Sequence, residues 1–176
     1  MAIIKPFKGY SPRKDLASQI ASPPYDVLNS EEAREMAKEN AHSFLHVVKS
    51  EIDFPIDEKP SKEQIYKKGA ENLEKLIASE LLIQDSMECL YLYEQQMGNI
   101  TQIGLVAGAS VDEYDNNLIK KHEHTRPDKE DDRAKHVEVL NANTGPVFLT
   151  YRHSEAIDKL VSELTEEKSY INFTAN

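Results

Sequence analysis

Residues 61–109 read SKEQIYKKGAENLEKLIASELLIQDSMECLYLYEQQMGNITQIGLVAGA and decide the fold of this chain. They begin with a capping box, Ser61 to Gln64, whose end side chains can satisfy free amides at a helix start. Apolar residues then recur at helical spacing, at Tyr66, Ala70, Leu73, Ile77 and Leu81. Two apolar segments follow, residues 89–95 and 101–109, around a Met-Gly-Asn turn that tolerates positive φ. We therefore predict a helix followed by a β-hairpin.

Outside this segment, helix and strand signals follow no regular alternation. Helices are predicted from Asn29 or Ser30 to about Asn40, from Pro127 to residues 143–145, and after Ser154. The last of these carries one apolar face, expected to point inward: Ile157, Leu160, Val161 and Leu164. Strand patterns lie at residues 43–48, 146–151 and 170–173. This mixture predicts a single α+β domain over residues 1–176, with helices packed on a mixed or antiparallel sheet.

The first 28 residues hold four of the eight prolines, at Pro6, Pro12, Pro23 and Pro24. Proline fixes one backbone angle and removes an amide donor, and it restricts the residue before it. We therefore predict an extended or turned N-terminal arm that wraps other elements.

Composition excludes several classes of protein. The formal net charge of −10 argues against unspecific binding to nucleic acid or to an anionic membrane. The single cysteine, Cys89, cannot form an intramolecular disulfide and is expected to be a small buried side chain. Residues 1–6 lack the pattern of a signal peptide, and no apolar segment is long enough to span a bilayer. These features predict a cytoplasmic protein that does not associate with membranes.

Residues 121–133, KHEHTRPDKEDDR, crowd cations, carboxylates and imidazoles between two apolar segments. As a phosphate or nucleotide site, Lys121 and Arg133 would bind oxygens, the arginine through its planar fork. Glu123 or Glu130 would act as a general base or hold Mg²⁺. The alternative is a solvated loop leading into a helix whose acidic residues favour its N-terminus.

The histidines of the chain give a weaker signal. His122 and His124 could share one face of a strand, but they lack a third ligand at a diagnostic spacing. We predict no metal site at these residues, and we interpret His46 as a hydrogen-bonded core histidine. No nucleophile arrangement or dinucleotide fingerprint has the context that it requires.

Five ordered phrases stand out: PFKGY (6–10), ASPPYDVL (21–28), SFLHV (43–47), NNLIKKHEHTRPDKEDDR (116–133) and GPVFLTY (145–151). Together they resemble the bacterial and archaeal family called domain of unknown function 1015. Members of that family are longer and carry a Gly-His-His-Arg motif that is absent here. The motif is similar to the phosphate-binding turn of the ParB and sulfiredoxin superfamily, some of whose members phosphorylate free serine.

The resemblance implies that this chain is the N-terminal part of a longer protein. That protein would be a phosphotransferase using ATP and Mg²⁺ on a small hydroxyl substrate such as free L-serine. The general base would be Glu123, with Glu130 or Asp132 as substitutes. Phosphate and substrate would contact a wider set: Lys121, His122, Thr125, Lys129, Asp132, Arg133, Tyr25 and Asp26.

The resemblance also implies that residues 21–28 and the charged run, residues 121–133, meet in space. It further implies that this chain alone is inactive without its C-terminal half. The alternative function is a non-catalytic regulatory module that binds a nucleotide or an anionic metabolite. A DNA-processing role, by analogy with ParB, is disfavoured by the negative charge and by the lack of a basic helix.

Overall fold

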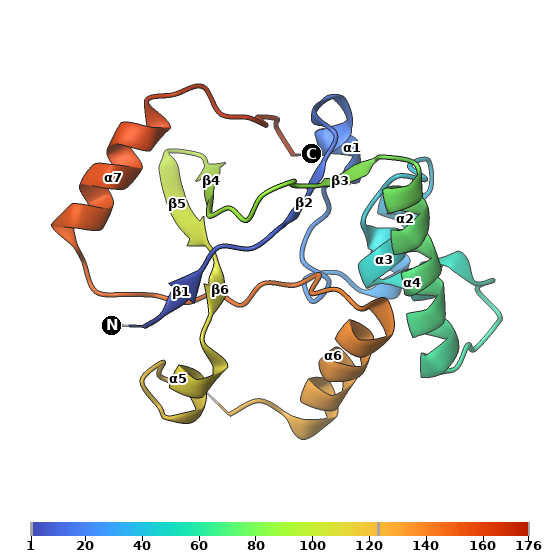
Figure 1. Ribbon diagram of the computed structural model, residues 1–176. Helices are drawn as coiled ribbons and strands as arrows, with labels where there is room; N and C mark the ends of the chain where they lie inside the picture. The colour runs from blue at the N-terminus through green and yellow to red at the C-terminus, as the bar shows by residue number, and fades with distance from the viewer. Residues whose placement is uncertain (1, 123, 176) are drawn as a thin grey trace. The chain divides into compact units, whose positions relative to one another are not determined.

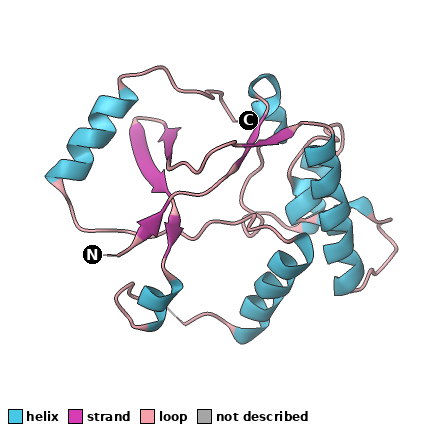
Figure 2. Ribbon diagram, in the orientation of Figure 1, coloured by secondary structure: helices cyan, strands magenta, loops and turns pink. Residues whose placement is uncertain are grey.

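The computed structural model describes residues 2–122 and 124–175 (Figure 1). Backbone contacts divide the chain into two compact units. Unit 1 consists of Met1–Ser11, Gln84–Thr125 and His153–Lys168, and unit 2 of Pro12–Ile83, Arg126–Arg152 and Ser169–Asn176. Helices and short antiparallel strands occur together, so the fold is α+β, as predicted (Figure 2). The expectation of a single domain stays a prediction.

Unit 2 is mainly helical. Its elements are η1 (Lys14–Leu16), α1 (Ala17–Ile20), α2 (Ser30–Ala37), α3 (Leu45–Val48), η2 (Ser50–Asp53), α4 (Lys62–Ala78) and α6 (Pro127–Leu140). Helix α4 packs against α3, η2 and α6. One buried apolar cluster contains Ile20, Val47, Leu73, Leu76, Leu82 and Leu140. A second contains Ala33, Ala37, Leu45 and Ile52. Helix α4 is therefore the element against which α3, η2 and α6 pack.

Local signals in the sequence set the starts of both capped helices of unit 2. At α4, the Ser61 side chain accepts from the Gln64 amide, and the Gln64 side chain accepts from the Ser61 amide at 2.8 Å. At α2, Asn29 and Glu32 form the same reciprocal pair. Both predicted starts are confirmed, while α2 ends at Ala37, before the predicted Asn40.

Gly69 lets α4 approach α3 closely. A Cβ atom at this position would lie only 2.7 Å from the carbonyl oxygen of Val47. Glycine lowers helix stability by up to about 1 kcal/mol relative to alanine. A larger residue at position 69 would push α3, and with it His46, away from α4, so the close packing requires glycine here despite its lower helix propensity.

Unit 1 contains the predicted hairpin. Strands β4 (Tyr91–Met97) and β5 (Ile100–Val106) pair antiparallel, with Tyr91 opposite Val106 and Met97 opposite Ile100. Gly98 takes a φ of 60° in the turn, as expected for this residue type. The unit also holds β1 (Ile4–Lys5) paired with β6 (Gly108–Ala109), together with α5 (Val111–Asp115) and α7 (Glu155–Thr165). Strands β2 (Tyr10–Pro12) and β3 (Leu82–Gln84) form a further two-stranded sheet.

Several predicted strands are wrong. Residues 45–48 form helix α3, because a short apolar run fits a buried helical turn as well as a strand. Residues 146–151 and 170–173 form no strand, since within the described ranges they pair with no other segment. The N-terminal arm is not extended throughout, because η1 and α1 occupy residues 14–20.

The last helix also differs from its prediction. Helix α7 begins after Ser154, as expected, but none of its residues is buried. Leu160 and Leu164 are about half exposed, so the apolar face that we expected to point inward is not buried against other elements of unit 1. Cys89, expected to be buried, is only half-buried.

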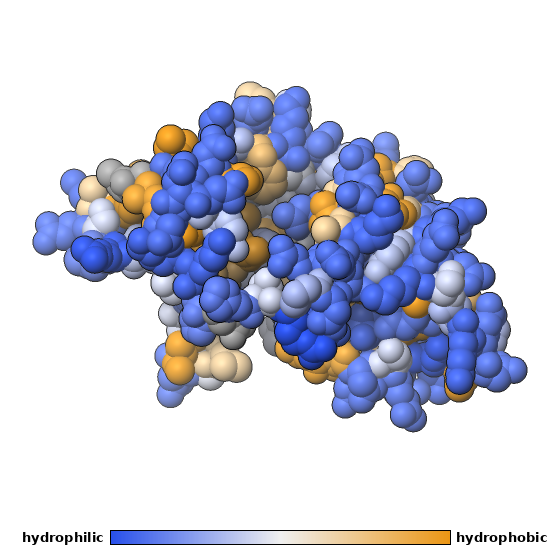
Figure 3. Space-filling model, turned by 90° about the horizontal axis from the view of Figure 1, so that it is seen from below, coloured by the Kyte–Doolittle hydropathy of each residue, from blue (hydrophilic) through white to orange (hydrophobic). Residues whose placement is uncertain are grey.

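Polar and charged residues cover most of the face in Figure 3, with hydrophobic residues in scattered patches. Among the helices in the described ranges, none combines the length and apolar composition that a bilayer span requires.

Candidate functional site

The C-terminal half of the charged run lies on helix α6. Pro127 stands in the first turn, where its missing amide costs nothing, and Asp128 and Glu130 also lie in that turn. The predicted helix start is therefore confirmed. Along the helix, Lys129 and Glu130 are exposed, Asp132 and Arg133 are half-buried, and His136 is buried. The residues of the run that enter the interior of unit 2 are thus Asp132 and Arg133.

Arg133 contacts Tyr25 of the ASPPYDVL phrase. Its guanidinium carbon lies 4.3 Å from the centre of the Tyr25 ring, a stacking distance for a cation on an aromatic face. The two phrases therefore meet in unit 2, although Tyr25 and Arg133 lie more than a hundred residues apart in the sequence. The Arg133 side chain is 34% exposed, so it remains accessible to a ligand.

Asp132 anchors this cluster. It accepts hydrogen bonds from the Tyr66 hydroxyl at 2.6 Å and from Arg133 Nη2 at 2.6 Å, and Lys62 Nζ lies 3.1 Å away. Burial works against its charged form, yet the hydrogen bonds from Tyr66 and Arg133 outweigh burial and hold the pKa of Asp132 well below its usual value. Burial and this carboxylate raise the pKa of Tyr66 to about 12. Asp132 thus stays ionised and fully engaged, which suits a positioning role and not that of a base.

His136 packs against Tyr66 of the same cluster. It is buried, its Nε2 lies 3.4 Å from the Val47 carbonyl oxygen, and its ring meets Tyr66 edge-on at 6.1 Å. Burial and the nearby Arg133 charge lower the pKa of His136, so the neutral ring donates to the carbonyl. This residue is a hydrogen-bonded core histidine.

The structure brings together only part of the predicted site. Tyr25, Asp132 and Arg133 are in contact, whereas Asp26, Lys129 and Glu130 are exposed residues of the same unit. The remaining described residues of the set belong to unit 1: Lys121, His122 and Thr125. Lys121 Nζ lies 4.5 Å over the Tyr114 ring. Glu123, the favoured base, lies outside the described residues.

The described residues include no group of three or more His, Cys, Asp or Glu side chains that could hold a metal ion.

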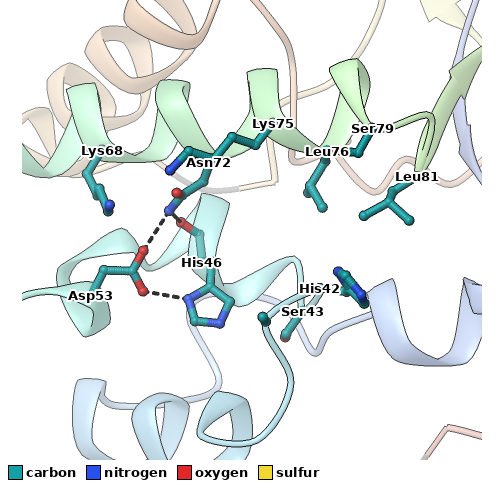
Figure 4. Close-up of a pocket in the computed structure, with 11 residues that line it drawn as sticks. His42, Ser43, His46, Asp53, Lys68, Asn72, Lys75, Leu76, Ser79 and Leu81 are labelled. Carbon is teal, nitrogen blue, oxygen red and sulfur yellow. Dashed lines mark hydrogen bonds and ion pairs between the residues drawn. The ribbon is translucent and has the colours of Figure 1, made fainter.

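A second polar cluster, which no sequence pattern indicates, lies where α3 and η2 face α4 (Figure 4). His46 Nδ1 lies 2.5 Å from Asp53 Oδ1, and its Nε2 lies 3.2 Å from the Asn40 carbonyl oxygen. The Asn72 amide donates to Asp53 Oδ2 at 2.7 Å and to the His46 carbonyl at 2.8 Å. Both ring nitrogens of His46 face acceptors, an arrangement that favours the protonated ring.

The contact between His46 and Asp53 should make the stability of the fold depend on pH. The hydrogen bond to Asp53 raises the pKa of His46, with burial opposing it. For Asp53, burial opposes ionisation, but bonds from His46 and Asn72 lower its pKa overall. The stabilisation is therefore fully present between the ordinary pKa values, 3.8 for Asp53 and 6.5 for His46. It is lost as pH rises through the raised pKa of His46 or falls through the lowered pKa of Asp53.

We therefore expect Asp53→Asn to lower Tm most between about pH 4 and pH 6.5, and progressively less above that window. Thermal melts from pH 4 to pH 9 measure this difference. Glu58→Gln, in an exposed loop of the same unit, is the control and should leave Tm nearly constant. A Tm difference for Asp53→Asn that is the same at pH 5 and pH 9 would contradict the prediction.

Comparison with known proteins adds one match. No curated protein and no solved structure matches the chain. One family matches residues 4–176, nearly the whole sequence, and it is the family that the five phrases indicated. The chain therefore belongs to the family described as protein of unknown function (DUF1015).

Proposed function

We propose that Arg133 binds a phosphate group of a nucleotide, and that the chain contributes this site to an ATP-dependent phosphotransferase acting in the cytoplasm on a small hydroxyl substrate such as free L-serine. One observation carries the proposal: Arg133 is stacked on Tyr25 and hydrogen-bonded to Asp132, so it is already fixed. Fixing an arginine beforehand reduces the conformational entropy that ligand binding would otherwise cost.

The hydrogen bonds of Arg133 leave part of its fork for a ligand. Both bonds to Asp132 use Nε and Nη2, at 3.2 and 2.6 Å. Within the described part of the chain, no acceptor for Nη1 is seen. A phosphate oxygen suits this group because arginine donates in a planar geometry that phosphate matches.

Phosphoryl transfer also requires a group that receives the hydroxyl proton. Asp132 is a poor candidate because its hydrogen bonds stabilise the ionised form. Glu130 stands three residues before Arg133 on α6, and side chains at this spacing share a helix face. We therefore propose Glu130 as a base beside the phosphate, with Glu123 as the other candidate. Mg²⁺ would arrive with the ATP phosphates and neutralise their charge.

Isothermal calorimetry with MgATP, MgADP and serine tests the binding step. Loss of a hydrogen bond to a charged group is worth about 2 kcal/mol, so we expect Arg133→Ala to weaken MgATP binding roughly 30-fold. Lys135→Ala is the matched control, because it removes an exposed cation of the same helix that pairs only with Glu138 among the described residues. Equal affinities of Arg133→Ala and wild type would refute the site, as would the absence of MgATP binding to wild type.

The alternative is a regulatory module that binds a nucleotide without turnover. This alternative is favoured by the contacts of Asp132 with Tyr66 and Lys62, because a carboxylate occupied in this way is not available as a catalytic base. Glu130→Gln and Glu123→Gln distinguish the two functions in an assay of serine phosphorylation. Loss of turnover with intact MgATP binding supports catalysis. Binding by wild type without any turnover, in the full-length protein, supports the module.

A further inference from the structure

Unit 2 contains a pocket that the proposed phosphotransferase does not use. Its volume is about 370 Å³, and it lies between α4 and the segment that runs from residue 41 to η2 (Figure 4). Lys68, Asn72 and Lys75 line it from one face of α4, which their spacing of four and three residues explains. His42, Ser43 and His46 line it from the opposite side. The residues that hold Arg133, by contrast, are absent from this lining.

The pocket carries an excess of positive charge. Asp53, the one carboxylate in its lining, is bonded to the His46 ring at 2.5 Å and to Asn72 at 2.7 Å. Lys68 lies near enough to Asp53 to help lower the pKa of that carboxyl. Among the described residues, neither Lys68 nor Lys75 forms an ion pair. Lys68 and Lys75 therefore line the pocket without a carboxylate at ion-pair distance among the described residues, so their charge suits an anionic ligand.

Hydrogen-bond donors accompany this charge. Ser43 is only 4% exposed, and its Oγ already accepts a bond from the Leu45 amide at 3.3 Å. Its own hydrogen is therefore the part that can bond to a ligand. The negative end of the α4 dipole lies at Ser79 and Lys75 stands in the last turn, so the helix dipole favours an anion on the Lys68 side of the pocket.

Other ligand classes fit less well. His46 cannot bind a metal or act as a base, because Asp53 and the Asn40 carbonyl occupy both of its ring nitrogens. Lysine ammonium groups act on phosphate as point charges and do not need the fork of an arginine. We propose that this pocket, with Lys68 and Lys75 as its cations, is a second anion site that binds the phosphate group of inorganic phosphate or of a small phosphomonoester.

Heteronuclear NMR titration tests this site, with inorganic phosphate and glycerol phosphate as separate probes. Sodium chloride at matched ionic strength is the reference. Phosphate is expected to shift the signals of His42, Ser43 and Asn72, and glycerol phosphate binds more tightly if the physiological ligand is an ester. Lys68→Gln and Lys75→Gln should each weaken binding roughly tenfold, as expected for a charge-assisted hydrogen bond.

Lys67→Gln is the matched control. Lys67 is an exposed lysine next to Lys68 on α4, and it does not line the pocket. Its replacement should leave the affinity unchanged, and so should Arg133→Ala, which separates this site from the proposed nucleotide site. The proposal is overturned if chloride shifts the same signals equally, or if Lys67→Gln weakens phosphate binding as much as Lys68→Gln.

Discussion

Replacing Leu45 by alanine is expected to lower the free energy of unfolding by about 3 kcal/mol, the typical cost of a buried leucine truncation. Leu45 has no exposed surface, and it belongs to the cluster with Ala33, Ala37 and Ile52. Two of these neighbours are alanines, which are too short to fill the space that the leucine side chain leaves. Helix α3 has only four residues, so it depends on this contact more than on its own hydrogen bonds.

Urea unfolding followed by circular dichroism measures this loss. Met36→Ala is the control, because it removes a side chain of similar size from α2 that is 49% exposed. We expect the control to lose less than about 1 kcal/mol, since little apolar surface is uncovered. Similar losses in the two variants would show that residues 45–48 do not pack as a buried helix, in contradiction to the fold described above.

Replacing Asp132 by alanine is expected to lower the free energy of unfolding by about 2 kcal/mol at neutral pH, because it leaves the buried Tyr66 hydroxyl and the Arg133 charge without their acceptor. The estimate is below that for a fully buried ion pair because the Asp132 side chain is 21% exposed. Tyr66→Phe removes one of these bonds and is expected to lose about 1 kcal/mol.

The same loss should depend on pH in a defined direction. The folded-state pKa of Asp132 lies below its ordinary 3.8, so its contribution is present above pH 3.8 and is lost as pH falls through the lowered pKa. Glu138→Ala is the control, because its ion pair with Lys135 on the same helix is well exposed. That variant should lose less than about 0.5 kcal/mol. If denaturant unfolding at pH 7 shows no difference between Asp132→Ala and Glu138→Ala, Asp132 does not anchor the cluster.

Elements with local signals could be predicted from the sequence. The capping residues Ser61 and Asn29, Pro127 at a helix start and Gly98 in a hairpin turn each act on their nearest neighbours. The failures depend on distant contacts. Residues 43–48 are a short apolar-rich run that we read as a strand, whereas residues 45–48 form helix α3, which packs closely against Gly69 of α4. Residues 146–151 have strand propensity and no partner strand among the described residues.

The candidate site could be predicted only in part. The order of residue types singled out the two phrases that contain Tyr25 and Arg133, and the family resemblance suggested that these two phrases meet in space. The sequence gives no sign of Tyr66 or Lys62 as partners of Asp132, because their contacts join separate helices. The contacts of Asp53 with His46 and Asn72 were likewise not predictable, because they also join separate elements. In addition, we interpreted His46 as a strand residue, so we did not expect it to lie on a helix beside the pocket.

The most direct test of the central claim is a double-mutant cycle on MgATP affinity, using Tyr25→Leu, Arg133→Lys and the double variant. If Tyr25 fixes Arg133 for phosphate binding, each single change weakens binding, and the double variant loses less than the sum by at least about 0.5 kcal/mol. Losses that simply add, or single variants that bind MgATP as wild type does, would contradict the account.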